Sequence, residues 1–373
     1  MVEYKYMVRV RCMTFNHAAY IEDTMNGFCM QETSFPYVCT IIDDCSTDGE
    51  QDVIKKYLEA YFDLEDSSVV RNEETDDYYL TFAKHKMNKN CFFAVLFLKY
   101  NHYSIRKSKK PYFEEWRDTK YVALCEGDDN WTNPNKLQMQ VEFMESHEDF
   151  AVCFGDVEFY NADNNYSKGK IGLLTRHDNL KAERYDGKEL FYRILLGKLT
   201  VCTLSALYRN SLISLIKKDN KTFMMGDTPL WLKLSQLGKF KYFDTVFGRY
   251  NIHQGSATRN PSTRLRFSLS KIEMRCYYCE KYGFCIPRTL KKEYNKAYKD
   301  MMIEQANIKP EPLYDIFKLN AIQYKIDKFI IGSKKVRNCY RRLKPIVSIK
   351  RMIVIKFSII LKALINLFYS IAK

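Results

Sequence analysis

Three acidic residues stand close together in the stretch LCEGDDNW, residues 124–131. Glu126, Asp128 and Asp129 disfavour one another unless a cation lies among them, because like charges raise each other's pKa or destabilise the fold. Mg²⁺ and Mn²⁺ prefer oxygen ligands and typically combine one or two protein carboxylates with the phosphates of a substrate. The stretch therefore indicates a divalent-cation site for a phosphorylated ligand, with an ordinary solvated turn as the alternative.

A second acidic stretch, IIDDCSTDG, occupies residues 41–49. Its spacing imitates the start of an EF-hand calcium loop, but Lys55 stands where that loop needs a glutamate, so an EF-hand is excluded. Asp43 and Asp44 could instead accept hydrogen bonds from the N–H groups of a base or from ribose hydroxyls. The alternative for Ser46 to Asp48 is a simple cap on the following helix.

Both acidic stretches follow apolar runs typical of buried strands. The first 71 residues predict strand, helix, strand, helix and a weaker strand, at 7–13, 21–31, 37–42, 53–62 and 69–70. This order is typical of an α/β fold with a mostly parallel central sheet. Because open sheets of this kind bind ligands at the carboxyl ends of their strands, we expect the two acidic stretches to meet there.

The rest of the chain continues this pattern less regularly. Residues 72–118 suggest an inserted helical piece, and further strands are expected at 121–125 and 151–160, with helices at 187–196 and 228–236. After about residue 260 the pattern becomes helical and charged. We therefore expect a catalytic or binding domain over 1–260, a helical extension over 261–330 and a separate tail over 331–373.

Charge is distributed unevenly along the chain. The formal net charge is +14, but residues 331–373 hold 11 lysines and arginines and no acid, which leaves +3 for residues 1–330. A nucleic-acid partner is not expected, because the folded body would then carry the positive surface. Twelve scattered cysteines and no apolar N-terminal leader predict reduced thiols in a cytoplasmic protein.

Five stretches, in order, resemble the family 2 glycosyltransferases, enzymes of the A-type glycosyltransferase fold. They span about residues 7–260 and are VRVRCMTFNHAAYIEDTMNGFCMQ, IIDDCSTDG, YVALCEGDDNWTNPNKLQMQVEFM, MMGDTPLWLKLSQLGKFKYF and GRYNIHQGSATR. The resemblance implies a single Rossmann-like domain, a nucleoside-diphosphate-sugar donor, a Mg or Mn cation and transfer with inversion at the anomeric carbon. Residues 72–118 depart from it, because they are longer than the usual link and lack its Gly-rich segment.

The resemblance also implies roles for the residues that match the nucleotide-binding motifs. Thr14 and Asn16 would lie under the nucleotide, in the loop after the first strand. Asp44 would contact the base, with Asp43 beside it.

The remaining implied roles concern the cation and the reaction. Asp129 would be the direct metal ligand, while Asp128 would lie nearer the ribose and phosphates and share the metal. Glu126 replaces a common aspartate, and His253 matches a histidine near the diphosphate or metal. Asp227 would be the catalytic base, since an inverting transfer needs a carboxylate to take the proton of the attacking hydroxyl. Its alternative is an N-cap before Thr228.

The sequence thus predicts a metal-dependent hexosyl- or N-acetylhexosaminyl-transferring enzyme with a glycan or lipid-linked acceptor, in bacterial polysaccharide or lipopolysaccharide assembly. One alternative is a nucleotidyltransferase on a similar sheet, which would release pyrophosphate and would not need Asp227. Another is a non-catalytic, lipid-associated scaffold with a relic sugar-nucleotide site.

The tail at 331–373 suggests where in the cell the protein is located. Its last part, PIVSIKRMIVIKFSIILKALINLFYSIAK, is interrupted by charges too often for a membrane span. On a helix most of its polar residues would form one stripe beside Ile, Leu, Val and Phe. With the basic run Lys334 to Lys344, this predicts a helix that lies on an anionic membrane at the inner face of the cell membrane. Packing on the protein or on a second subunit is the alternative.

Overall fold

The computed structural model describes residues 4–164, 166–170, 177–256, 264–287, 290 and 292–293. The chain divides into two compact units, Met1–Asn260 and Pro261–Lys373. Helix α8 (Arg264–Lys281) makes up most of the described part of the second unit. The predicted tail at 331–373 and most of the predicted extension at 261–330 lie outside the described residues. None of the helices in these ranges combines the length and the apolar character that a bilayer crossing needs.

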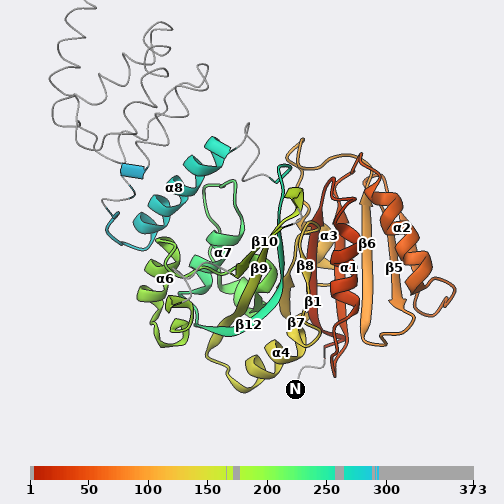
Figure 1. Ribbon diagram of the computed structural model, residues 1–373, viewed down its shortest axis with the longest axis horizontal. Helices are drawn as coiled ribbons and strands as arrows, with labels where there is room; N and C mark the ends of the chain where they lie inside the picture. The colour runs from red at the N-terminus through yellow and green to blue at the C-terminus, as the bar shows by residue number, and fades with distance from the viewer. Residues whose placement is uncertain are drawn as a thin grey trace, which may run out of the picture. The chain divides into compact units, whose positions relative to one another are not determined.

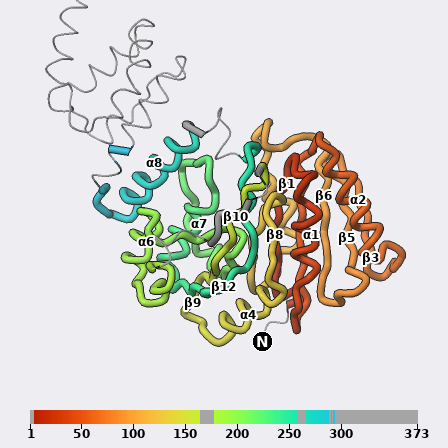
Figure 2. Tube along the Cα trace, in the orientation of Figure 1, coloured from red at the N-terminus to blue at the C-terminus, as the bar shows by residue number. Residues whose placement is uncertain are grey.

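The first unit is an α/β fold built on one large mixed sheet, whose centre is parallel as predicted (Figures 1 and 2). The strand order is β3-β5-β6-β2-β1-β7-β11-β9-β12-β8, with β4 beside β5 and β10 beside β9. Strands β6, β2, β1 and β7 run parallel to one another. The elements of this half are β1 (Tyr6–Thr14), α1 (Ile21–Cys29), β2 (Tyr37–Asp43), α2 (Glu50–Tyr61), β6 (Cys91–Leu98) and β7 (Thr119–Leu124).

Strand register brings the predicted site loops to one edge of this sheet. Thr14, the last residue of β1, lies opposite Asp43, the last residue of β2. Beyond the end of β7, the peptide N–H of Gly127 donates to the carbonyl oxygen of Met13 at 3.0 Å. The loops after β1, β2 and β7 therefore begin side by side, as expected for the carboxyl ends of parallel strands.

The centre of the sheet is covered on both faces, which explains why every residue of β2 is buried. Side chains alternate between faces along a strand. Tyr37, Cys39 and Ile41 belong to the apolar cluster on the face of α1 and α2. Val38 and Ile42 belong to the cluster that contains residues of the short helix α3 (Lys110–Glu114).

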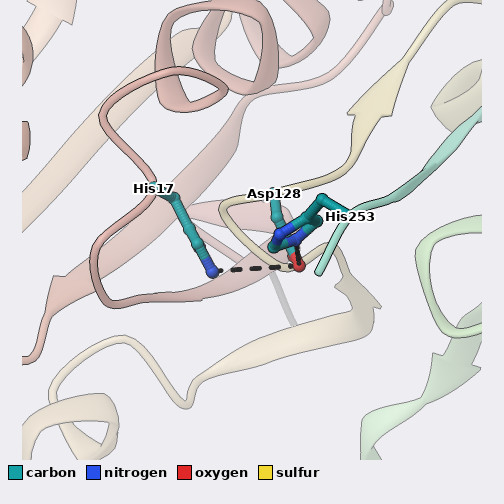
Figure 3. A group of neighbouring side chains, drawn as sticks. All are labelled: His17, Asp128 and His253. Carbon is teal, nitrogen blue, oxygen red and sulfur yellow. Dashed lines mark hydrogen bonds and ion pairs between the residues drawn. The ribbon is translucent and has the colours of Figure 1, made fainter. Parts of the chain in front are cut away.

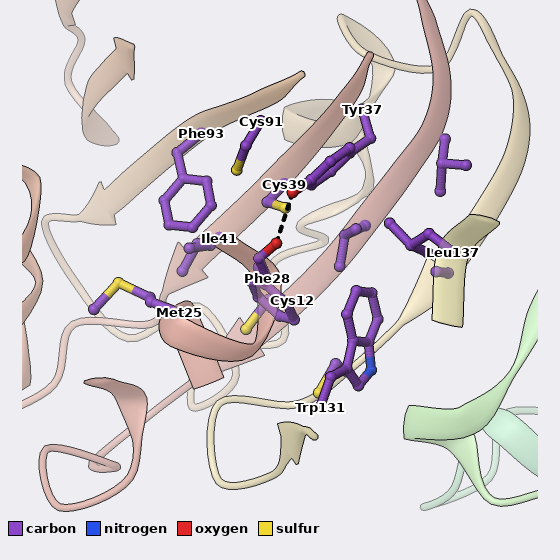
Figure 4. Packing of buried hydrophobic residues seen from close by; sticks show 14 of the residues in the cluster. Cys12, Met25, Phe28, Tyr37, Cys39, Ile41, Cys91, Phe93, Trp131 and Leu137 are labelled. Atoms are coloured by element: carbon purple, nitrogen blue, oxygen red, sulfur yellow. Dashed lines mark hydrogen bonds between the residues drawn. The ribbon is translucent and has the colours of Figure 1, made fainter. Parts of the chain in front are cut away.

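Helix α1 fixes the first of these clusters (Figure 4). Phe28 is fully buried, with its ring 4.9 Å from the ring of Trp131, and its carbonyl oxygen accepts a hydrogen bond from the Tyr37 hydroxyl at 2.7 Å. Burial of such a ring contributes about 1.5–3 kcal/mol. One residue earlier, Gly27 lies so close to the backbone of Trp131 that a Cβ would be 2.7 Å from its carbonyl oxygen.

The predicted helical insertion at 72–118 is wrong for most of its length. The segment forms β4 (Arg71–Glu74), β5 (Tyr78–His85), β6 and only a short helix, α3 (Lys110–Glu114). The run CFFAVLFL in β6 is apolar because it pairs with β2 and β5 inside the sheet, and such a short run does not distinguish a buried strand from a helix. The weaker strand predicted at 69–70 is also wrong, because the peptide N–H of Val69 donates a hydrogen bond to the Asp66 carbonyl oxygen in a turn. The short strand β3 (Phe62–Asp63) lies before this turn.

The other half of the sheet is built around two long strands. β9 (Phe150–Asn161) and β12 (Lys239–Ile252) pair in parallel, and β12 also pairs with β8 (Asn130–Trp131), which follows the acidic loop. This pairing brings the end of β12 beside residues 126–129. The other elements are α4 (Lys136–Ser146), η1 (Ala162–Asn164), β10 (Tyr166–Lys170), η2 (Ala182–Arg184), α6 (Gly187–Leu195), η3 (Thr203–Ser205), β11 (Leu207–Arg209), η4 (Asn210–Leu215) and α7 (Asp227–Leu234).

Candidate functional site

The loops after β1 and β2 are joined by hydrogen bonds through Asn16. Its peptide N–H donates to Ser46 Oγ at 2.9 Å, and its Oδ1 accepts from the peptide N–H of Thr47 at 2.8 Å. Asn16 has a φ of 59°, in the left-handed region that asparagine tolerates better than most residues. The side chain for which the sequence implied a nucleotide contact thus holds two site loops together.

Asp43 and Asp44 follow one another but face different partners. Asp43 is buried and accepts from the Gln51 amide at 2.5 Å, and burial raises the pKa of its carboxyl group. Asp44 accepts from the peptide N–H groups of His102 at 2.8 Å and Tyr103 at 3.1 Å, and pairs with Lys109 Nζ at 2.7 Å. Asp44, for which a base contact was implied, therefore anchors the loop after β6.

The capping alternative for the stretch after β2 holds in part. The N-cap of α2 is Gly49, with a φ of 91°, and Asp48 Oδ1 accepts from the peptide N–H of Glu50 at 3.1 Å. Asp48 also accepts from the peptide N–H of Ala18 at 2.9 Å, so the same residue ties the helix start to the loop after β1.

The acidic loop separates its two aspartates. Asp129 is 5% exposed, and its Oδ1 accepts from the peptide N–H of Asn251 at 2.9 Å. Burial, followed by the charges of Asp128 and Glu126, raises the pKa of Asp129 well above its usual value. Burial also acts to raise the pKa of Asp128, but the hydrogen bond from His253 and the nearby His17 outweigh it, and the pKa is lowered. Asp128 is therefore the aspartate held in its charged form.

His17, Asp128 and His253 form a cluster that could hold a metal ion (Figure 3). Asp128 Oδ2 lies 3.0 Å from His253 Nε2 and 3.8 Å from His17 Nε2, and the three ligand atoms all lie within 4.8 Å of one another. The His253 ring is nearly buried and packs against the ring of Tyr20, with a centroid distance of 5.0 Å. The two imidazole nitrogens suit a divalent transition metal, and the carboxylate oxygen is the kind of ligand that Mn²⁺ prefers.

This cluster agrees with two of the expected ligands, Asp128 and His253, and differs at two positions. Asp129, the expected direct ligand, lies against Asn251 instead, because its side chain points into the protein. His17 was not expected. Its position in the loop after the first strand, directly after Asn16, is the sequence signal that could have indicated it.

Glu126 and Asp227 interact electrostatically beside this cluster. Glu126 lies at the exposed rim of the cluster. Desolvation of its carboxyl group, then the charges of Asp128 and Asp227, raises its pKa to about 7, with Arg11 acting in the opposite direction. Asp227 is the first residue of α7, after the N-cap Gly226, and its Oδ2 accepts from Thr203 Oγ1 at 3.1 Å. The N-cap alternative for Asp227 thus does not hold, although its Oδ1 accepts from the peptide N–H of Thr228 at 2.6 Å.

Glu50 is a second residue that the sequence analysis missed. It is the first residue of α2 and is fully buried, and its carboxylate accepts from Thr14, Ser46 and the backbone of His17. The sequence shows only that a glutamate directly follows the motif IIDDCSTDG, because the burial of Glu50 and its hydrogen-bond donors come from the fold.

Known proteins resemble this chain over part of its length. No protein-family model matches it. Over 151 residues, which are 40% of this chain and 35% of the relative, it is 29% identical to an uncharacterized protein of Mycobacterium tuberculosis. Over 145 residues, 39% of this chain, it is 29% identical to the "Putative teichuronic acid biosynthesis glycosyltransferase TuaG" of Bacillus subtilis, of which 44% is covered. The chain thus spans less than half the length of the curated relatives it matches.

Solved structures align over more of the chain, at lower identity. S. aureus TarS 1-349 in complex with UDP-GlcNAc aligns with a TM-score of 0.46 and 14% identity, over 90% of this chain and 91% of that chain. The mannosyltransferase PcManGT from Pyrobaculum calidifontis, in complex with GDP-Man and Mn²⁺, aligns with a TM-score of 0.46 and 10% identity, over 90% and 87%. The chain resembles glycosyltransferases, as its motifs predicted.

Proposed function

We propose that the chain is a divalent-cation-dependent, inverting glycosyltransferase that moves a sugar from a nucleoside-diphosphate-sugar donor to an acceptor hydroxyl. The observation that carries the proposal is the cluster of His17, Asp128 and His253 at the carboxyl edge of a largely parallel sheet, with Asp227 nearby. The similarity to TuaG, a glycosyltransferase by name, supports the same activity.

The three side chains of the cluster would hold the cation through two imidazole nitrogens and one carboxylate oxygen. When bound, such a cation neutralises charge that develops on a diphosphate leaving group. The remaining work falls to the chain itself. Asp227 would accept the proton of the attacking hydroxyl, a role for which its half-buried position and the hydrogen bond from Thr203 are suitable.

The acceptor that we propose is a glycan or a lipid-linked sugar in bacterial surface-polysaccharide assembly. Teichuronic acid biosynthesis, in the name of TuaG, supports this class of acceptor. The basic residues of the segment 331–373 support a place on the anionic inner face of the cell membrane, where a lipid-linked acceptor would be within reach.

Thermal denaturation of the full chain with nucleoside diphosphates and their sugars, with and without Mn²⁺, tests the donor. A ligand that binds only the native state raises the melting temperature by mass action, so one nucleotide should stabilise the chain in a Mn²⁺-dependent way. If no nucleotide sugar stabilises the chain or is consumed by it, the proposal is wrong.

The Asp227→Asn variant tests the reaction. Loss of a general base lowers turnover about 100- to 10,000-fold, while the thermal shift with donor should be retained. Asp118→Asn, at an exposed position, is the matched control and should keep native turnover. Release of pyrophosphate in place of a nucleoside diphosphate would identify a nucleotidyltransferase instead.

A further inference from the structure

Three donors converge on the buried carboxylate of Glu50. The Thr14 hydroxyl donates to Oε1, while Ser46 Oγ and the peptide N–H of His17 donate to Oε2 at 2.8 and 2.9 Å. Burial raises the pKa of Glu50, and these hydrogen bonds act against that rise because they favour the charged form. In all three contacts a carboxylate oxygen of Glu50 is the acceptor and the neighbour is the donor.

The direction of the hydrogen bond to Glu50 determines where the proton of the Thr14 hydroxyl points. A hydroxyl has one proton to donate, and Thr14 gives it to Glu50. The Thr14 oxygen also lies 3.2 Å from His17 Nδ1, so it can only accept there, and Nδ1 has to carry the proton. In a neutral imidazole the other nitrogen then has a free lone pair, and His17 Nε2 is the atom that lies 3.8 Å from Asp128 Oδ2.

The acidic loop packs directly against this arrangement at Gly127. A Cβ at this position would lie 2.1 Å from Thr14 Oγ1 and 3.2 Å from His17 Nδ1, so only glycine leaves the two groups where they are. The Gly127 peptide N–H also donates a hydrogen bond to the carbonyl oxygen of Met13, near the end of β1. Thr14 and the His17 ring are therefore held between α2 and the acidic loop.

We propose that Glu50 and Thr14 are positioning residues, which fix the Nδ1–H tautomer and the orientation of His17 so that its Nε2 is a ligand for the divalent cation. The inference rests on the proposed function for the cation, and it gives the Thr14 side chain a different role from the nucleotide contact implied by the sequence. Carboxylates that orient a metal-binding histidine typically change metal affinity 10- to 100-fold when they are mutated.

Nitrogen-15 NMR of the metal-free full chain, labelled at its six histidines, tests the tautomer without any turnover. The His17 signals are assigned from their loss in His17→Gln. We expect the Nδ1–H form in the native chain and in Thr14→Ser, which keeps the hydroxyl. Thr14→Val, which has the same shape without it, and Glu50→Gln should lose that form.

Mn²⁺ titration followed by electron paramagnetic resonance gives the second readout. We expect Thr14→Val and Glu50→Gln to weaken Mn²⁺ binding 10- to 100-fold, with Thr14→Ser within about threefold of the native chain. Asp52→Asn is the matched control, because it removes the same charge from an exposed position of α2 and should leave Mn²⁺ affinity unchanged. Circular dichroism verifies that each variant is folded, and Thr14→Val keeps the test decisive if Glu50→Gln does not fold.

An Nε2–H tautomer in the native chain, or unchanged Mn²⁺ affinity in both Thr14→Val and Glu50→Gln, would overturn the proposal. The proposed function fails in a different way. A native chain that has the Nδ1–H tautomer and binds Mn²⁺ with the expected losses in the variants, but transfers no sugar, would uphold the positioning role and refute the glycosyltransferase.

Discussion

Asp128 and Asp129 are adjacent in the chain, but their surroundings give them opposite properties. Asp129 is buried against the backbone of Asn251, and this burial raises its pKa. Asp128 lies between two histidines and its pKa is lowered. Burial thus makes the charged form of Asp129 less favourable, whereas the imidazoles beside Asp128 make its charged form more favourable.

Glu126 gives this arrangement a pH dependence that can be measured without a cation. Its pKa in the folded chain is about 7, against 4.5 when it is unperturbed. Between these two values the unfolded chain loses its proton at Glu126 while the folded chain keeps it. The unfolded chain then binds fewer protons, so the free energy of unfolding falls as the pH rises from about 4.5 to about 7.

Melting temperatures of the native chain and Glu126→Gln, recorded from pH 4 to 8 with a chelator, isolate this effect. We expect the native chain to lose stability relative to the variant across that window and to show a constant difference outside it. Glu148→Gln, at an exposed position, should give no such trend. Parallel curves for the native chain and Glu126→Gln would show that the carboxyl group titrates normally.

Among the elements, those whose pattern is amphipathic or flanked by turn residues were predictable from the sequence. The first two strands and the helix between them were found, because Ile21, Met25 and Phe28 have helical spacing and Tyr37 to Asp43 is short and β-rich. The strand β6 was missed, since an apolar run of eight residues has no period that separates strand from helix.

The candidate site was predictable where the acidic stretches or the family resemblance indicate chemistry, and less so where partners in the fold decide it. Asp128 was expected from its acidic stretch and from the resemblance, His253 from the resemblance alone, and their side chains meet in the structure. Asp44, Asp129 and Glu50 could not be assigned in this way, because their roles depend on backbone N–H groups and hydroxyls contributed by distant segments. No spacing in one segment contains that information.

The close approach of α1 to β8 gives a prediction at the scale of elements. In an open helix, Gly→Ala stabilises by about 0.5–1 kcal/mol, because glycine loses more backbone freedom on folding. At Gly27 the added Cβ would lie 2.7 Å from the carbonyl oxygen of Trp131, and backbone atoms there cannot move without disturbing the acidic loop. We expect Gly27→Ala to lower the free energy of unfolding in urea by about 1–3 kcal/mol.

Gly226→Ala is the control for this substitution. Gly226 has a φ of −105°, and no heavy atom lies within 4 Å of the position of its Cβ. The control should therefore change the free energy of unfolding by less than about 0.5 kcal/mol. If Gly27→Ala were as stable as the control, the contact between the two elements would be looser than described.

At the scale of the whole molecule, the excess positive charge and the candidate site residues lie in different segments of the chain. The candidate site lies within Met1–Asn260, whereas most of the excess positive charge belongs to residues 331–373. A transferase acting on a lipid-linked acceptor needs both a donor site and a means of reaching the membrane. We therefore propose that these two tasks belong to different segments and can be separated by deletion.

Deletion of residues 345–373 tests this separation. The deletion removes five basic residues and the apolar face predicted beside them, and each lysine or arginine near an anionic surface contributes about 1 kcal/mol. In co-sedimentation with phosphatidylserine-containing vesicles, we expect the native chain to bind and the shortened chain to stay in solution, while both give the same thermal shift with Mn²⁺ and nucleotide. Higher salt and uncharged vesicles should each weaken binding of the native chain, because screening acts on exposed charges. Equal vesicle binding by both chains would assign the basic segment to a protein partner or to the chain's own surface instead.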